Sequence, residues 1–228
     1  MNLLAFDTST EAFSIATSRD DVVTEEFFVP EQKHTEILLA GIEKALQDSS
    51  LSFAELDALV YGRGPGAFTG VRLAVAVAQG LGFSTDLPVV GVSSLAAVAQ
   101  QVYADTGHRK VIVALDARMS EVYCAAYEFS TAGEAHCVVS EQVCEPGSLA
   151  IPDCGGWVSA GTGWSAYAEE FSMAVQDVIE LHTEILYPRA SAMLALAARD
   201  LNDGLATSAA AAVPVYLRND VAKKSNQK

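Results

Sequence analysis

The stretch LLAFDTSTE, residues 3–11, and the stretch VIVALDARMSE, residues 111–121, share one pattern and together decide the fold. Each begins as a short apolar run typical of a buried strand and ends in an aspartate, Asp7 or Asp116. A short polar turn and a glutamate follow in both, and each copy then continues into a second strand-like run. We interpret the two copies as β-hairpins of an internal duplication, so the chain is expected to form two related α/β lobes.

The rest of the chain alternates segments that favour strands with segments that favour helices. Before the second copy we expect strands over residues 12–17, 22–29, 56–61 and 89–92, and helices over residues 35–47, 69–83 and 94–103. After it we expect helices over residues 164–175 and 191–201, a loop-rich segment with a weak strand or two over 130–156, and a short strand or extended segment over 213–218. The predicted division is into an N-terminal lobe, residues 1–105, and a C-terminal lobe, residues 106–228, which ends in a basic tail.

The composition is that of a folded acidic protein. Half of the 228 residues are hydrophobic and 19% are charged, which excludes a disordered chain, and the formal net charge is −15. Such an acidic surface repels the phosphate backbone of nucleic acids, so we expect tRNA or any other RNA to be reached only through a complex. The charge fits a basic partner and a merely solvated surface equally well.

No pattern of residues indicates a metal site or a catalytic centre. The four cysteines include no Cys-x-x-Cys pair, the four histidines include no His-x-x-x-His pair, and a Gly-x-Ser-x-Gly motif is missing. The N-terminus does not resemble a signal peptide, and the most apolar stretch, residues 71–83, is interrupted by Arg72 and Gln79. We therefore expect reduced thiols, no membrane span and a cytoplasmic location.

The polar turns of the two hairpins resemble phosphate-binding turns. Proteins of the actin, heat-shock and sugar-kinase superfamily place a nucleotide phosphate against such a hairpin, normally with a glycine at the close approach. No glycine occurs between Asp7 and Thr17, so the first hairpin is expected to bind phosphate poorly. The alternative is a plain turn in which aspartate and threonine satisfy backbone groups. The residues that we assign to degenerate loops of this kind are Asp7, Thr8, Gly64, Gly66, Asp116 and Arg118.

A glycine-rich loop, GRGPGAFTGVR at residues 62–72, joins a predicted strand to a predicted helix. Helix N-termini offer free N–H groups to anions, but this loop lacks the Gly-Lys-Ser/Thr of a Walker A motif. It also matches a loose dinucleotide pattern, although Asp86 lies in a turn and not at the strand end where a ribose-binding acid belongs. We therefore do not expect a dinucleotide site.

The helix after this loop is apolar nearly all round. Gly70, Ala74, Ala78 and Gly82 form a ridge of small residues at four-residue spacing, which lets another helix approach closely. The earlier helix, residues 35–47, also carries more apolar side chains than one stripe requires. Two explanations are open: both are ordinary core helices, or they share an exposed apolar face with a partner.

These segments together resemble the TsaB (YeaZ) family of bacterial tRNA threonylcarbamoyladenosine biosynthesis. The stretches that carry the resemblance are LLAFDTST (3–10), HTEILL (34–39), GRGPGAFTGVR (62–72), GVSSL (91–95), DARMSEVY (116–123) and PVYLRN (214–219). The similarity weakens between about residues 130 and 191. It implies an α/β, actin-like or sugar-kinase-like (ASKHA) duplicated fold with two lobes.

The resemblance further implies that the chain is not itself an enzyme. It would be a non-catalytic scaffold that activates TsaD, the paralogous subunit with the metal-binding histidines, in a complex that also uses the ATPase TsaE. It implies a direct heterodimer with TsaD through the two apolar helices, and we expect a homodimer through the same helices when the chain is isolated. No cofactor or metal is expected in this chain, although the complex uses ATP.

We assign the partner contact to the two apolar helices. The residues assigned are Leu38, Leu39, Ile42, Gly70, Arg72, Ala74, Val75, Ala78 and Gly82. The alternative functions are an ATP-dependent small-molecule kinase of the same superfamily and a glycoprotease-like peptidase. The glycine-poor first hairpin argues against the kinase, and the missing histidine pair argues against the peptidase.

Overall fold

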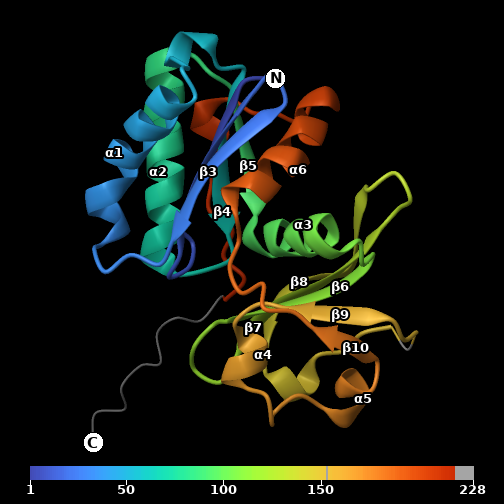
Figure 1. Ribbon diagram of the computed structural model, residues 1–228. Coiled ribbons are helices and arrows are strands. Elements are labelled where there is room, and N and C mark those ends of the chain that lie inside the picture. The colour runs from blue at the N-terminus through green and yellow to red at the C-terminus, as the bar shows by residue number, and fades with distance from the viewer. Residues whose placement is uncertain (153, 219–228) are drawn as a thin grey trace, which may run out of the picture.

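The computed structural model describes residues 1–152 and 154–218, which form two lobes, each built on a five-stranded sheet (Figure 1). The first lobe contains β1 (Leu3–Asp7), β2 (Phe13–Arg19), β3 (Val22–Phe28), α1 (His34–Asp48), β4 (Ala58–Gly64), α2 (Phe68–Thr85), β5 (Val89–Ser93) and α3 (Ser94–Thr106). The later elements are β6 (Lys110–Asp116), β7 (Val122–Phe129), β8 (Ala135–Cys144), β9 (Trp157–Ala160), α4 (Gly163–Ala166), α5 (Met173–Gln176), β10 (Ile179–His182) and α6 (Ala190–Asn202).

The sheet pairings confirm the duplication expected from the two hairpins. The first sheet has the order β3-β2-β1-β4-β5 and the second has the order β10-β9-β6-β7-β8. In each, the first hairpin strand pairs antiparallel with the next strand and parallel with a later one: β1 with β2 and β4, and β6 with β7 and β9. The two-lobed actin-like α/β fold is therefore present.

Helices cover both faces of each sheet because successive strand residues point to opposite faces. On the first sheet, Leu4 and Phe6 pack under α1 and α2, while Leu3 and Ala5 pack under α6. Helix α3 supplies Leu95 and Val98 to one face of the second sheet, and the short helices α4 and α5 cover its other face. In Figure 1, α3 lies between the two lobes.

Three segments correct or refine the sequence expectations. The helix expected over residues 164–175 is two short helices, since Phe171 turns back to stack on Trp164 at 4.0 Å and Ser172 caps a new helix. The loop-rich segment, in which we expected a weak strand or two, contains the ten-residue strand β8. Residues 213–218 form no strand, which leaves the extended alternative, and the Val215 amide donates to the Arg63 carbonyl at 2.8 Å.

The boundary between the lobes also differs from the expected division at residue 105. Helix α6 belongs to the expected C-terminal lobe, yet Ala190, Met193 and Leu194 are buried against the first sheet. The following Ala209 and Ala212 belong to the core under α2. The chain therefore crosses to the second lobe after α3 and returns with α6. The basic residues expected at 223–228 lie outside the described residues.

No helix in the described ranges combines the length and the hydrophobicity that a bilayer crossing requires.

Candidate functional site

The turn of the first hairpin is covered by the glycine-rich loop. The Ala67 amide, at the start of α2, donates to the Ser9 carbonyl at 2.7 Å, and the Thr8 hydroxyl donates to the Gly70 carbonyl at 2.7 Å. The Ser9 hydroxyl lies 2.8 Å from that of Ser94, at the start of α3. A backbone amide that a phosphate-binding loop would offer to a ligand is thus used within the chain.

The glycines of this loop allow the chain to approach itself. A Cβ at Gly66 would lie 2.2 Å from the Ser9 carbonyl oxygen, and a Cβ at Gly70 would lie 1.9 Å from the Thr8 carbonyl oxygen. Gly64 has a φ of 91° and lies against Val215. The close approach that glycine permits here is to the first hairpin and to the C-terminal segment.

Asp7 ends β1 in a fully buried position. One carboxylate oxygen accepts hydrogen bonds from the Ser9 amide at 2.9 Å and the Ser9 hydroxyl at 2.8 Å. The other oxygen has no hydrogen-bond partner among the described residues. Burial raises the pKa of Asp7 to about 6, and the two bonds from Ser9 oppose that rise. Asp7 therefore orders its own turn instead of facing a ligand.

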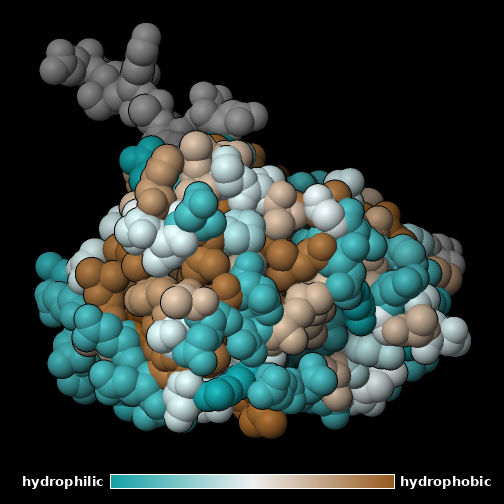
Figure 2. Space-filling model, turned by 90° about the horizontal axis from the view of Figure 1, so that it is seen from above, coloured by the Kyte–Doolittle hydropathy of each residue, from teal (hydrophilic) through white to brown (hydrophobic). Residues whose placement is uncertain are grey.

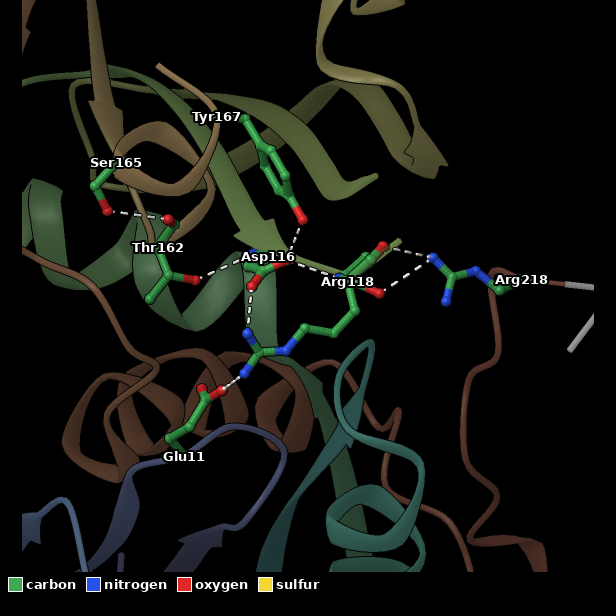
Figure 3. Close-up of polar contacts among 8 residues, drawn as sticks. Glu11, Asp116, Arg118, Thr162, Ser165, Tyr167 and Arg218 are labelled. Atoms are coloured by element: carbon green, nitrogen blue, oxygen red, sulfur yellow. Dashed lines mark hydrogen bonds and ion pairs between the residues drawn. The ribbon is translucent and has the colours of Figure 1, made fainter. Parts of the chain in front are cut away.

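The turn of the second hairpin presents an arginine to both lobes. Arg118, Met119 and Ser120 all have positive φ, between 58° and 62°. The Arg118 guanidinium donates to Asp116 at 2.8 Å and to Glu11 of the first hairpin at 2.5 Å (Figure 3). This side chain therefore bridges the two hairpins.

Further contacts hold this turn in place. Asp116 also accepts from the Tyr167 hydroxyl at 2.8 Å, and its amide donates to Thr162 at 3.0 Å (Figure 3). The Arg218 guanidinium donates to the Ala117 carbonyl at 3.1 Å and forms an ion pair with Glu121. The backbone of three consecutive left-handed residues is strained, so these contacts are needed to hold it.

A cleft of about 570 Å³ lies between the two hairpins. Residues 9–11 and 66–68 form one wall, residues 115–118 form the other, and residues 215–218 complete the rim. Each charged residue that lines this cleft already has a partner in the chain: Arg118 binds Glu11 and Asp116, Arg72 donates to the Tyr216 hydroxyl at 2.6 Å, and Arg218 binds Glu121. Within the described residues no group of three His, Cys, Asp or Glu side chains is placed to hold a metal ion.

The structure separates the residues that we assigned to the partner contact. Six of them lie inside the first lobe, since they are buried against the chain's own sheet or its C-terminal segment: Leu38, Ile42, Ala74, Val75, Ala78 and Gly82. Gly70 lies against the first hairpin. Only Leu39 and Arg72 are exposed. The ridge of small residues is thus an internal contact, which corrects the expectation that this ridge receives a partner helix.

A different stripe of α2 faces outward. Ala76 and Gly80 are exposed at the same four-residue spacing, and Phe68 and Phe83 at the two ends of the helix are 50% and 69% exposed. On α1, Leu39 is 58% exposed. Seen from above in Figure 2, apolar side chains form a patch left of centre, on the side where Figure 1 places these helices, and smaller apolar patches lie elsewhere on this face. Sequence reasoning missed this stripe because a helix that is apolar all round gives no period that selects its outer face.

Comparisons with known proteins cover nearly the whole chain. A family model described as "TsaD: tRNA N6-adenosine threonylcarbamoyltransferase" matches residues 21–225. The chain is 39% identical to the tRNA threonylcarbamoyladenosine biosynthesis protein TsaB of Escherichia coli, across 98% of this chain and 97% of that protein. It is 37% identical to the protein of the same name in Haemophilus influenzae, across 98% of this chain and 96% of that protein.

Solved structures agree with these matches. YeaZ from Pseudomonas aeruginosa superposes with a TM-score of 0.87 at 38% identity, covering 95% of this chain and 99% of that one. A second structure from the same organism, described as similar to peptidase YEAZ, superposes with a TM-score of 0.89 at 39% identity and covers the same shares. By sequence along its whole length and by fold, the chain belongs to the TsaB (YeaZ) family.

Proposed function

We propose that this chain takes part in forming threonylcarbamoyladenosine in tRNA as a non-catalytic subunit that binds and activates TsaD. The biosynthetic role follows from the full-length similarity to the Escherichia coli and Haemophilus influenzae proteins of that name. The observation that carries the non-catalytic role is the closure of the first hairpin by the chain's own loop. The Ala67 amide and the Thr8 hydroxyl bind the chain itself, and Arg118 bridges the two hairpins.

The exposed stripe on α2 supports a helix-mediated contact with TsaD. Ala76 and Gly80 leave room for a partner helix to approach, because a Cβ at Gly80 would meet no atom within 4 Å. Phe68 and Phe83 flank them with exposed aromatic surface, and aromatic side chains are enriched in protein interfaces. The stripe is equally suited to self-association, so a homodimer of the isolated chain would compete with the heterodimer.

The heterodimer would act together with TsaE, ATP and tRNA. TsaE and ATP would act on the heterodimer, with no cofactor bound by this chain alone. The acidic composition, with a net charge of −15, supports an arrangement in which the partner binds tRNA and this chain contributes little to RNA affinity.

Reconstitution with one component omitted tests the proposal. TsaC, which would make the threonylcarbamoyl-adenylate, is combined with TsaD, TsaE, ATP, threonine, bicarbonate and unmodified tRNA. The mixture is prepared with and without this chain, and modified adenosine is measured by mass spectrometry of tRNA digests. We expect modification only when the chain is present, together with a one-to-one complex with TsaD on size-exclusion chromatography. Equal modification without the chain would reject the proposal.

A further inference from the structure

Two cysteines of the second lobe lie in direct sulfur contact. The Sγ atoms of Cys124 on β7 and Cys144 on β8 are 3.4 Å apart. Cys144 pairs across the ladder with Val122, so the two thiols are diagonal neighbours on one face of the sheet. The other two cysteines, Cys137 and Cys154, are exposed.

The two thiols differ in access and in acidity. Cys124 is fully buried in the core of the second lobe, whereas Cys144 is half-buried as the last residue of β8. Either thiol can donate in this contact; with Cys124 as the donor, the hydrogen bond lowers the pKa of Cys144 to about 7 and raises that of Cys124. A hydroxyl from Ser148 adds to the effect on Cys144. Cys144 is thus the accessible member and the one that ionises near neutral pH.

We propose that Cys124 and Cys144 form a reversible intrachain disulfide by exchange with a small-molecule disulfide. The Cys144 thiolate attacks one sulfur of the small disulfide, which forms a mixed disulfide and releases one small thiol. Cys124 then loses its proton, attacks the Cys144 sulfur and displaces the second small thiol, which takes up that proton. In sum, two protein thiols and one small disulfide give one protein disulfide and two small thiols. Both electrons from the protein thiols reduce the small disulfide.

The local fold allows the two sulfurs to close to bonding distance. A disulfide requires about 2.05 Å between sulfur atoms, so the present contact must shorten by roughly 1.4 Å. β8 is the edge strand of its sheet, and Cys144 is its last residue. The register of the β7–β8 ladder also shifts directly after Cys124. Movement of one edge-strand terminus is therefore sufficient, and the ladders β6–β7 and β6–β9 stay in place.

The test is a thiol count on the full chain after equilibration with oxidised glutathione. Alkylation of the denatured protein is followed by peptide mass mapping, with the exposed thiols removed in the background variant Cys137→Ser/Cys154→Ser. We expect both remaining thiols to be lost together, with a Cys124–Cys144 linked peptide that dithiothreitol dissolves. In the variant that also carries Cys144→Ser, Cys124 should stay reduced because its partner is gone and its thiol is buried away from glutathione.

Two results would overturn the inference. In one, both thiols of the background variant can still be alkylated after equilibration with oxidised glutathione. The other is glutathione that stays attached to Cys144 while Cys124 remains a free thiol, since this would show that Cys124 cannot reach its neighbour. Adding Cys124→Ser to the background supplies the reference for that second result, because a mixed disulfide on Cys144 is the only product open to it.

Discussion

At the scale of single residues, Asp7 is a buried carboxylate that orders its own turn. Its carboxyl accepts two bonds from Ser9 and leaves one oxygen without a partner among the described residues. From the sequence we expected Asp7 at the end of a strand, with no glycine in the turn that follows. We therefore predicted a degenerate loop that binds phosphate poorly. What the sequence could not predict is that the glycines of a distant segment, at 66 and 70, close over this turn.

The first prediction concerns the charge of Asp7. Its pKa of about 6 lies above the ordinary value of 3.8. Because the folded state favours the protonated carboxyl, Asp7 makes its full contribution to stability below pH 3.8. This contribution is lost as the pH rises through 6. At pH 7 the ionised form should thus cost about 3 kcal/mol at most.

Asp7→Asn should raise the free energy of unfolding by about 1–3 kcal/mol at pH 7 and change it little at pH 4. Urea unfolding at both pH values measures this, and equal destabilisation at both would contradict it.

A pair of glycines in α2 gives the second prediction. At Gly70 a Cβ would collide with the Thr8 carbonyl, whereas at Gly80 it would meet nothing within 4 Å. Gly70→Ala should destabilise the chain by about 1–3 kcal/mol because backbone must move. Gly80→Ala should stabilise it by about 0.5–1 kcal/mol because alanine loses less entropy in a helix. Chemical denaturation measures the free energy of unfolding of both variants, so the same substitution is compared at two positions of one helix. Similar effects would show that the hairpin does not pack on α2 as described.

At the scale of elements, the sequence predicted the strands and helices that have a clear local pattern of apolar residues. It predicted less well the elements that depend on contacts with residues distant in the sequence. The hairpin strands and the helices α1, α2, α3 and α6 were confirmed, since their periodicity or buried runs are strong. For β8 the sequence indicated only a weak strand, because its burial is slight and irregular, so it shows no alternation of apolar residues. The break between α4 and α5 arises from stacking of Phe171 on Trp164, which no propensity encodes.

The outer face of α2 carries the third prediction. Gly80→Arg places a long cation in open space on the proposed partner face, so the chain should fold normally and lose most of its affinity for TsaD. Ala78→Arg places the cation in the core, so that variant should unfold instead, as a buried unpaired charge costs several kcal/mol. Circular dichroism and size-exclusion chromatography with TsaD separate the two outcomes.

Ala104→Arg is the matched control for this experiment, since Ala104 is an exposed position of α3. It should change neither folding nor TsaD binding. Full affinity of the Gly80→Arg variant would place the partner elsewhere on the molecule.

At the scale of the whole molecule, α3 packs against both lobes, and the exposed ion pair between Arg118 and Glu11 spans the cleft between the hairpins. Arg118 joins the hairpins, and Arg218 and Val215 tie the C-terminal segment to the two lobes. The sequence predicted two lobes of duplicated origin, but it placed α6 with the second. The return of α6 to the first sheet could not be predicted, because an alanine-rich helix fits either lobe equally well.

The fourth prediction follows from the paired groups that line this cleft. The isolated chain should bind ATP weakly, because the nearest cation is already paired with Glu11 and Asp116 and the Ala67 amide is bonded to Ser9. Titration calorimetry with MgATP should give no saturable heat at micromolar concentrations. A tight one-to-one site would favour the kinase alternative.

The central claim is that this chain supports transfer by binding TsaD and contributes no chemistry, and one measurement tests it most directly. The yield of threonylcarbamoyladenosine is compared in the reconstituted reaction for the wild-type chain, for a Glu11→Gln/Arg118→Gln cleft variant and for Gly80→Arg. The cleft pair is largely exposed, so its loss should cost at most about 1 kcal/mol of stability. We predict near wild-type yield with the cleft variant and a strongly reduced yield with Gly80→Arg. A cleft variant that binds TsaD normally and yet abolishes the modification would contradict the account.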